Sequence, residues 1–356
     1  MGRLARVGIA GLGWGSLVHV PAFRAADGFE VAALCGRDGG RLREAGAKWG
    51  INDLSTDWRH FVRRDDLDVI SVATPPAEHR PMVECAFAAG KHVICEKPAA
   101  PTAPDVRSML AAAEQSGQAH AVSFELRWLP EHQRLIELVE SGALGTPVLV
   151  QITRNVSMWH PSCGAIPPWK FQLNEGGGFL NAVLAHDIDL VARLFGSPTA
   201  VCATTAQALA AQFGLQAGDA EDTAALLLRL QSGAMASISG TAVSPHGSVY
   251  ELEAAGTEAS VHLRAGADGP VLTLGRAGEP TEQVQLAARV PARRAPIPED
   301  YPLARQVRAM ALLLEDWRPA LESGTSPVPG FREALLVQQV IDAARLSAAG
   351  AGWVEV

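Results

Sequence analysis

Residues 7–16 read Val7-Gly8-Ile9-Ala10-Gly11-Leu12-Gly13-Trp14-Gly15-Ser16, and this stretch decides the fold. A short apolar run enters a glycine-rich turn, and a helical pattern follows over residues 17–26. A turn in this context is typical of dinucleotide-binding proteins, because a helix N-terminus attracts a pyrophosphate. Gly11 permits the tight turn, Gly13 lets the backbone approach the phosphates, and Ser16 takes the third small position. A purely structural turn in another α/β protein is the alternative.

Apolar runs and helical patterns alternate through residues 1–123. The apolar runs are continuous, which is typical of parallel strands covered by helices on both faces. We therefore predict an N-terminal dinucleotide-binding Rossmann domain over residues 1–123, with strands at 29–35, 69–73, 92–95 and 120–123 and helices at 38–49, 81–89 and 104–117.

The pattern changes after residue 123, where longer runs alternate between apolar and polar residues. Such alternation is typical of antiparallel strands with one solvated face. A chain of 356 residues also exceeds what one hydrophobic core usually holds. We therefore predict a second α/β domain over residues 124–356 with a largely antiparallel sheet, its strands including 148–153, 223–230, 234–241, 250–255 and 271–274 and its helices 180–195, 307–322 and 331–349.

The composition excludes several classes of partner. The formal net charge is −8 and no basic block occurs, so we expect no nucleic-acid partner and no anionic membrane surface. No apolar run approaches the roughly 20 residues of a membrane span, and residues 1–6 lack the apolar stretch of a signal peptide. The five cysteines are scattered, which predicts neither a disulfide framework nor a structural metal site and fits the cytoplasm.

The end of the second strand predicts the type of coenzyme. In an NAD-binding protein a carboxylate that binds the ribose 2′-hydroxyl is expected here. Gly36 and Arg37 occupy the place instead, and a guanidinium suits a 2′-phosphate because it binds phosphate in a bidentate fork. We therefore expect NADP as the cofactor. NAD remains the alternative if Arg37 is solvent-exposed and Asp38 only caps the next helix.

Two further strand ends carry candidate residues. Ligands of an open α/β sheet lie beyond the carboxyl ends of its strands, so Thr74 and Pro75 are expected beside the cofactor. His79 follows, and it caps a helix, touches the ribose or has a surface role. Glu96-Lys97-Pro98 follows the strand at 92–95, where the dinucleotide would meet a substrate.

Several motifs together resemble the Gfo/Idh/MocA oxidoreductases, the relatives of glucose–fructose oxidoreductase and inositol dehydrogenase. The resemblance covers essentially the whole chain. It implies a second domain with a large open antiparallel sheet, whose outer face such proteins usually bury in homodimers or homotetramers. It also implies hydride transfer between a nicotinamide and a secondary alcohol or ketone of a sugar-like small molecule. The motifs are the glycine turn, Ala73-Thr74-Pro75, Gly90-Lys91-His92-Val93, Glu96-Lys97-Pro98, Gly176-Gly177-Gly178, His186-Asp187-Ile188-Asp189, Glu221-Asp222-Thr223-Ala224 and residues 338–345.

The resemblance also assigns roles to residues. Lys97 takes the place of the family's lysine near nicotinamide and substrate, where it can stabilise charge that develops on the reacting oxygen. His186 takes the place of a histidine whose neutral ring can accept a proton as hydride leaves. The residues expected at the cofactor are Gly11, Gly13, Trp14, Gly15, Ser16, Gly36, Arg37, Thr74, Pro75, His79, Glu96, Lys97 and Arg127. Those expected at the substrate are Lys97, Trp128, Trp159, Trp169, Asn181, Ala182 and His186.

Two of the aromatic assignments rest on sequence position. Trp169 precedes the glycine triplet, and it either walls a sugar face or is an ordinary core tryptophan. Residues 158–163 contain Trp159 and predict a substrate-facing aromatic lid. His160 and Cys163 in this segment are too few ligands for a metal site.

The sequence departs from the family pattern beside His186. Many relatives have an aspartate four residues before this histidine, on the same helix face, and a glycine between the two. Ala182 and Leu184 stand at these positions here. The lost carboxylate and the bulk of Leu184 predict a substrate less hydroxylated than glucose or inositol, or a reaction weighted toward reduction.

Retention of both Lys97 and His186 predicts an enzyme, because a protein that only binds a dinucleotide needs neither. Two alternatives remain open at the level of sequence, since a fold does not fix a function. One is a non-redox dinucleotide-binding sensor or regulatory protein. The other is a hydrolase or eliminase that uses the cofactor transiently.

Overall fold

The structure of the protein, a computed structural model, describes residues 3–164, 166–209, 219–246, 248–266, 268–287, 289–292, 297–298, 300–324 and 326–356. The chain forms two compact units. The first takes its described residues from Met1–Leu129 and Arg289–Leu335, and the second from Pro130–Ala288 and Leu336–Val356. The boundary predicted after residue 123 lies near the first change of unit, but the sequence did not indicate the later return of the chain to the first unit.

The sheet of the first unit is parallel in its pairings. Its strand order is β3-β2-β1-β4-β5-β6, so the order reverses between β1 and β4, as in a Rossmann fold. The predicted fold class is therefore confirmed. The two-residue β3 is too short to show a pattern in the sequence. The strands are β1 Ala5–Ala10, β2 Phe29–Cys35, β3 Leu54–Ser55, β4 Val69–Val72, β5 His92–Cys95 and β6 His120–Val122.

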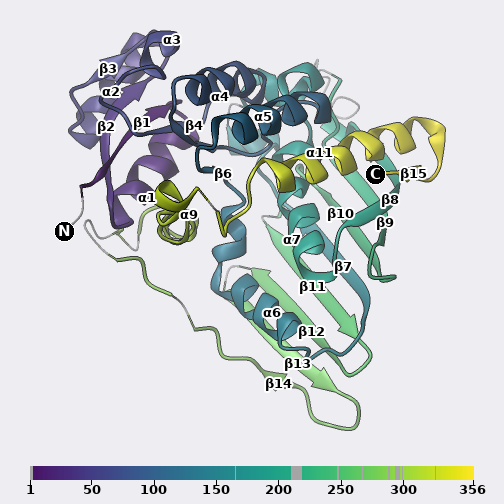
Figure 1. The fold of residues 1–356 in the computed structure, drawn as a ribbon. Coiled ribbons are helices and arrows are strands. Elements are labelled where there is room, and N and C mark those ends of the chain that lie inside the picture. Colours follow the sequence, from purple (N-terminus) through teal and green to yellow (C-terminus); the bar gives the residue numbers. More distant parts are fainter. Residues whose placement is uncertain are drawn as a thin grey trace. The chain divides into compact units, whose positions relative to one another are not determined.

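Helices cover this sheet on both faces (Figure 1). On one face α1 packs against α9, and on the other α4 packs against α5. Apolar residues of α9, among them Met310, Leu313 and Trp317, join the core that α1 and β2 begin. The helices of this unit are α1 Val20–Ala25, α2 Gly39–Trp49, α3 Trp58–Phe61, α4 His79–Ala88, α5 Ala103–Ser116, α9 Ala304–Trp317 and α10 Ala320–Ser323.

Short polar residues and glycines set the ends of these helices. The Asp38 carboxylate accepts hydrogen bonds from Gly40 N at 2.8 Å and Arg41 N at 3.1 Å, which fixes the start of α2. Gly50 ends the same helix with φ of 63°, a left-handed conformation that suits glycine. Capping by Asp38 is the arrangement that the sequence offered as the alternative to a phosphate-binding role for its neighbour Arg37.

The second unit contains a nine-stranded sheet with the order β14-β13-β12-β11-β7-β10-β9-β8-β15. It is mostly antiparallel, as expected, although β7 and β10 pair in parallel. The sequence missed β8, β12 and the two short edge strands. The strands are β7 Pro147–Asn155, β8 Pro198–Ala206, β9 Thr223–Leu230, β10 Met235–Thr241, β11 Val249–Gly256, β12 Ala259–Gly266, β13 Gly269–Arg276, β14 Glu282–Gln283 and β15 Val354–Glu355.

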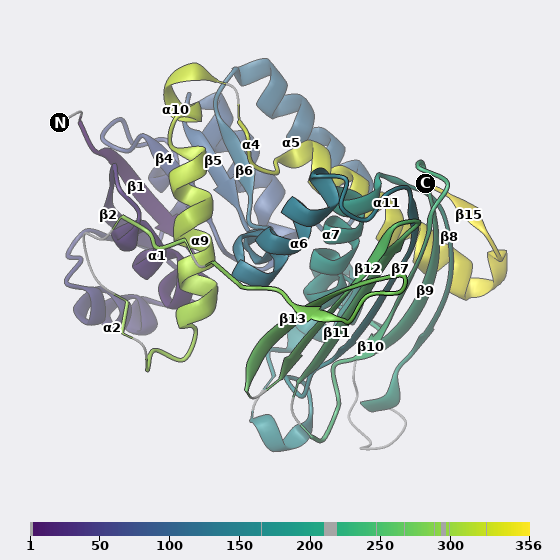
Figure 2. The ribbon, with the colours of Figure 1, turned by 90° about the horizontal axis from the view of Figure 1, so that it is seen from below.

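The two faces of this sheet differ. The helices α6 Pro130–Glu140 and α7 Ala185–Phe195 lie on one face (Figure 2). Alternate residues of β9 are buried on that side, whereas Leu227 is 53% exposed on the other, as is Met235 of β10 at 60%. The long helix α11, Phe331–Leu346, starts in the first unit and continues into the second.

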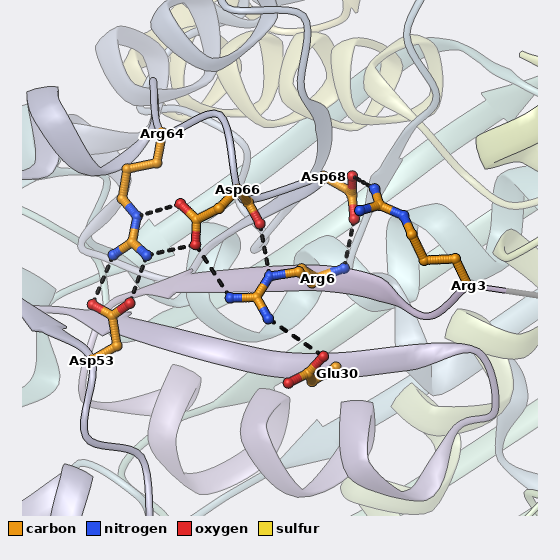
Figure 3. A network of polar contacts seen from close by, with 7 residues as sticks. All are labelled: Arg3, Arg6, Glu30, Asp53, Arg64, Asp66 and Asp68. Atoms are coloured by element: carbon orange, nitrogen blue, oxygen red, sulfur yellow. Dashed lines mark hydrogen bonds and ion pairs between the residues drawn. The ribbon is translucent and has the colours of Figure 1, made fainter.

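A polar network fastens the amino ends of the strands in the first unit (Figure 3). Arg64 forms hydrogen bonds with Asp53 at 2.7 Å and with Asp66 at 2.8 Å. Arg6 of β1 reaches Asp66 at 3.2 Å and Glu30 of β2 at 3.6 Å. The Arg64 guanidinium holds the pKa of the Asp66 carboxyl well below its usual range. Because ligands of such sheets bind at the opposite, carboxyl edge, this network serves the architecture.

Candidate functional site

The glycine turn has the shape that a bound pyrophosphate requires. Gly11 has φ of 118°, and a Cβ there would lie 2.1 Å from the carbonyl oxygen of Ala73, so only glycine fits. Gly13 is exposed, and a Cβ on it would meet no atom within 4 Å. Gly15 packs closely, with its Cβ position 3.2 Å from Ile9. The turn therefore leaves its backbone open on one side and fits a dinucleotide.

Contacts with Trp49 of α2 support the residues that follow the turn. Trp14, at the tip of the turn, is half-buried, and Ser16 is buried in the helical turn that follows. The Ser16 hydroxyl accepts a hydrogen bond from Nε1 of Trp49 at 3.0 Å. The cationic groups of Arg24 and Lys48 lie 5.5 Å and 5.0 Å from the centre of the Trp49 ring. Helix α2 thus anchors the start of the phosphate-binding segment.

The tip of β2 has a packing reason for its glycine. A Cβ on Gly36 would lie 2.4 Å from Cδ1 of Leu12, so a side chain there would displace Leu12. Arg37 is exposed beside it. Packing against Leu12 is therefore a sufficient reason for the absence of a carboxylate at this place. The exposed Arg37 and the capping Asp38 match the alternative under which NAD remains possible.

The segment after β4 places Thr74 and Pro75 as half-exposed residues at the carboxyl edge. His79 is buried, so a surface role for it is wrong. Its Nε2 lies 2.7 Å from the Thr74 carbonyl oxygen and its Nδ1 3.1 Å from that of Ala99. Burial lowers the pKa of His79. Because both ring nitrogens face backbone carbonyls, His79 joins two loops of the site and does not offer a nitrogen to a ribose.

Glu96 is the centre of a buried polar chain behind Lys97. Its Oε1 lies 2.8 Å from Nε2 of His19, and Nδ1 of His19 lies 2.7 Å from the hydroxyl of Ser71. Its Oε2 accepts a hydrogen bond from the backbone N–H of Lys97 at 3.1 Å. His19 and Ser71 are buried. The chain connects the glycine turn, β4 and β5, and it fixes the backbone from which Lys97 projects.

Sequence reasoning missed Glu125, which follows β6 at the same edge. The residue is only 2% exposed, and burial together with the charge of Glu96 raises its pKa to about 8, while Lys97 opposes the shift. Its Oε2 has no hydrogen-bond partner in the described parts of the chain. The signal that would have found it is the one that marked Glu96, an ionisable residue just after an apolar strand.

The neighbours of Glu125 differ in placement. Arg127 is half-buried, which leaves its assignment to the cofactor open as a proposal. Trp128 lies in the apolar core of the first unit, where its Nε1 donates to Asp316 of α9 at 2.7 Å. The assignment of Trp128 to the substrate is therefore corrected, because its ring packs internally and its polar atom is engaged.

In the second unit the glycine triplet lies on a buried ion pair. Arg345 and Glu221 approach to 3.1 Å, and Oε1 of Glu221 also accepts from Leu180 N at 3.1 Å. A Cβ on Gly178 would lie 2.3 Å from that same oxygen, and Gly178 has φ of 102°. The triplet is needed so that Glu221 can cap the start of the helical segment that carries His186.

His186 and Ala182 share an accessible helix face. Among residues 181–190 these two are half-buried, and the others are buried. Their i, i+4 spacing agrees with the predicted geometry. Leu184 is buried, so the prediction that its bulk enters the site is wrong. Asn181 is also buried, and its Nδ2 donates to Gly177 O at 3.1 Å, so its assignment to the substrate is corrected to a packing role.

A second ion pair holds the helix next to His186. Arg154 of β7 donates both Nε and Nη2 to the carboxylate of Asp187, each at 2.6 Å. The guanidinium also lies 4.0 Å from the ring centre of Tyr250. Burial raises the pKa of Tyr250, and the Asp187 charge acts in the same direction. Because Asp187 directly follows His186, this bidentate pair fixes the rotation of α7.

The other two tryptophans assigned to the substrate, Trp159 and Trp169, differ in burial. Trp159 is fully buried and meets Phe171 edge to face, with 5.5 Å between ring centres, so it is no exposed lid. Trp169 is half-buried and remains a proposal for the substrate site. In the same segment Nδ1 of His160 lies 2.7 Å from the hydroxyl of Ser162.

In the described residues no group of three or more His, Cys, Asp or Glu side chains lies close enough to hold a metal ion. All five cysteines are free there. No helix of the described segments is both long and apolar enough to span a bilayer.

Comparison with known families matches most of the chain. Residues 5–124 match the model of an oxidoreductase family with an NAD-binding Rossmann fold. Residues 132–262 match the GFO/IDH/MocA C-terminal domain. The two matches adjoin near the change of unit after Leu129.

Individual relatives agree with these matches. The D-apiose dehydrogenase of Paraburkholderia graminis is 30% identical over 346 residues, covering 96% of this chain and 86% of that protein. The levoglucosan dehydrogenase of Pseudarthrobacter phenanthrenivorans is 27% identical over 354 residues, covering 88% and 86%. A structure of levoglucosan dehydrogenase in complex with NADH and L-sorbose has a TM-score of 0.88 at 24% identity, covering 100% of this chain and 99% of that chain. The last likeness concerns the fold.

Proposed function

This chain belongs to the Gfo/Idh/MocA oxidoreductase family, and on that premise we propose which residues carry its reaction. It is an NAD(P)-dependent oxidoreductase that acts on the CH–OH group or ketone of a sugar-like molecule. When bound, the nicotinamide donates or accepts hydride. A non-redox sensor and a hydrolase or eliminase are not favoured, because the relatives of named activity are dehydrogenases or reductases.

Lys97 is the residue that we assign to the reacting oxygen. The observation that supports this most directly is its position: Lys97 follows β5 at the carboxyl edge, on a backbone fixed by Glu96 and His19. An ammonium group there stabilises negative charge on an alkoxide as hydride departs, and it donates a proton to the oxygen during reduction.

His186 is the residue that we assign to proton transfer in the second unit. Its side chain lies on the accessible face of the helical segment, and Asp187 and Arg154 fix that helix from the other side. Only one proton moves to or from the substrate oxygen. In oxidation a neutral imidazole accepts it, and in reduction, where Lys97 gives its proton to the oxygen, the protonated ring replaces the proton that Lys97 has lost.

Replacement of these residues tests the proposal. Lys97→Met is expected to lower kcat about 100-fold or more for whichever of D-apiose, levoglucosan and their keto forms the wild type turns over. Tryptophan-fluorescence titration with NADPH and NADH should show that the variant still binds coenzyme. Arg43→Met, which removes an exposed cation of α2, is the control. His186→Asn should lose activity similarly, with His160→Asn as control. Unchanged turnover in Lys97→Met would refute the proposed site.

We also infer a reaction weighted toward reduction, because Ala182 supplies no carboxylate to strengthen His186 as a base. Ala182→Asp places a carboxylate four residues before His186 on the same accessible face. The ratio of oxidation to reduction rate should rise in this variant. An unchanged ratio would show that the alanine does not set the direction.

NADP is the coenzyme that we propose, because the end of β2 offers no carboxylate to a ribose 2′-hydroxyl and Arg37, beside Gly36, offers a guanidinium to a 2′-phosphate. The exposure of Arg37 leaves NAD as the alternative. Arg37→Ala should weaken NADPH binding by about tenfold and leave NADH binding unchanged, since only NADPH carries the 2′-phosphate. Arg43→Ala, an exposed arginine of α2, is the control. Equal affinity of the wild type for both coenzymes would favour NAD.

We further infer a homodimer or homotetramer that uses the open sheet face, where Leu227 and Met235 are exposed. A double variant, Leu227→Glu with Met235→Glu, should elute as a smaller species in size-exclusion chromatography with light scattering. Retention of the wild-type mass would place the contact elsewhere. The free cysteines support a reducing compartment, and we propose the cytoplasm.

A further inference from the structure

Two buried carboxyl groups lie at the carboxyl ends of neighbouring strands in the first unit. Glu96 directly follows β5, and Glu125 follows β6 by a short turn. The strands are joined there, because Ser123 N donates to Cys95 O at 2.9 Å. Glu96 is 7% exposed and Glu125 is 2% exposed. Neither belongs to the amino-edge network of arginines shown in Figure 3.

The two carboxyl groups differ in their hydrogen bonds. Both oxygens of Glu96 are engaged, Oε1 with His19 and Oε2 with the backbone N–H of Lys97. Oε2 of Glu125 has no partner within the described residues. An ionised carboxylate left in such a position is costly, whereas a neutral carboxyl is less so and can donate to a ligand or water.

Two adjacent buried carboxyl groups resist ionising together, since each disfavours the charge of the other. The shift of the Glu125 pKa agrees with this, because burial and the charge of Glu96 raise the pKa while the charge of Lys97 lowers it. The packing helix α9 also faces this turn, but its Asp316 is paired with Trp128 and Arg289. Glu96 and Lys97 are therefore the charges that act on Glu125.

We propose that Glu125 is a positioning residue of the hydride-transfer site: it holds the single proton of a Glu96–Glu125 carboxyl pair and leaves Lys97 facing one carboxylate charge. The inference rests on the proposed role of Lys97. In reduction, Lys97 gives its proton to the carbonyl oxygen as hydride adds to the carbon. The Glu125 proton stays on Glu125 throughout. Loss of that proton would add a second negative charge, which favours the ammonium form and makes Lys97 a weaker proton donor.

Infrared spectroscopy can detect the proton on Glu125 directly, without turnover. At pH 7 the wild type is expected to show the carbonyl stretch of a protonated carboxylic acid, and Glu125→Gln should lack it. Glu44→Gln, on exposed α2, makes the same chemical change and should keep the band. Loss of the band in Glu96→Gln but not in Glu125→Gln would overturn the assignment, as would a band that survives in both variants.

Kinetics test the effect of this proton on Lys97. Wild-type kcat for reduction should fall up to tenfold per pH unit above about pH 8, where Glu125 loses its proton. Glu125→Gln should lack this alkaline fall, and Glu44→Gln should retain it. An identical fall in Glu125→Gln, while Lys97→Met has lost activity, would refute the inference and leave the proposed site standing. Full activity in Lys97→Met would instead refute the proposed site, and the infrared result would still locate the proton.

Discussion

The buried carboxyl groups of the two units differ in their partners. In the second unit Asp187 and Glu221 are each paired with an arginine, Arg154 and Arg345. In the first unit Glu96 contacts a histidine, and Glu125 belongs to none of the ion pairs found among the described residues. The paired acids join elements that are far apart in the sequence. An unmatched buried acid tends to keep its proton, and such groups concentrate where chemistry occurs.

The largest expected change in stability comes from removing the arginine partner of a buried carboxylate. Arg154→Met leaves the Asp187 carboxylate buried without its partner, which should lower the free energy of unfolding by about 3–5 kcal/mol. Urea denaturation followed by circular dichroism measures the loss. The double variant Arg154→Met with Asp187→Leu removes both charges and should recover much of it. A single variant as stable as the wild type would mean that the pair carries no structural role.

Removal of Glu125, the buried acid without an ion-pair partner among the described residues, should raise the stability at alkaline pH instead of lowering it. The folded-state pKa of Glu125 is raised to about 8, so the folded protein binds more protons than the unfolded chain between about pH 4.5 and pH 8. Stability therefore falls as pH rises through this window, by at most about 1.4 kcal/mol per pH unit from this group. Glu125→Gln should flatten that fall and be more stable than the wild type at pH 8. Thermal midpoints measured from pH 5 to pH 9 decide the matter, with Glu44→Gln expected to follow the wild type.

A smaller loss of stability is expected when a paired carboxylate is pushed from its position but keeps its arginine partner. Gly178→Ala places a Cβ against Glu221 at a positive φ and should cost about 2 kcal/mol of unfolding free energy. Gly142→Ala, also at a positive φ but with no atom within 4 Å of the new Cβ, isolates the backbone cost of about 1 kcal/mol. Equal losses in both variants would show that the contact with Glu221 adds nothing.

The smallest effect should come from the solvated network at the amino edge. Arg64→Ala removes the cation shared by Asp53 and Asp66, yet ion pairs whose carboxylates are solvent-exposed, here 43% and 47%, contribute only about 0.2–1 kcal/mol. Because Arg64 lowers the pKa of both acids, the stability that it adds is present above their unfolded pKa and is lost as pH falls. Urea midpoints at low and high salt should show a small loss that salt reduces. A loss as large as that of Arg154→Met would remove the distinction between buried and exposed pairs.

The sequence predicted the features that local patterns encode. Continuous apolar runs marked the strands of the first unit, and the glycine turn was recognisable because Gly11 and Gly13 occupy positions that backbone geometry restricts. Alternation marked much of the second sheet. Lys97 was found because it follows a recognisable strand end. Each of these signals is contained within about ten residues.

Burial against distant segments was not predictable in this way. Trp128 packs beside α9, which is far away in the sequence, and its Nε1 binds Asp316. Leu184 lies two residues from both Ala182 and His186, which are accessible, yet it is fully buried. Glu125 follows an apolar strand as Glu96 does, but no recognised motif marked it, and the burial and the charge of Glu96 that raise its pKa come from the fold. The sequence could therefore name the edge on which the site lies, but not the acid that tunes it.

The contribution of α9 to the first unit has a consequence for the order of events during synthesis. Helices α1 and α9 share one apolar core, although nearly the whole substrate-side sheet is translated between them. A nascent chain that has emerged only as far as β6 still exposes the surface of Phe23 and Phe29 that Trp317 later covers. The dinucleotide-binding unit therefore cannot close on the ribosome before the second sheet has left the exit tunnel. A fragment that ends after residue 129 would leave this apolar surface without the cover of α9.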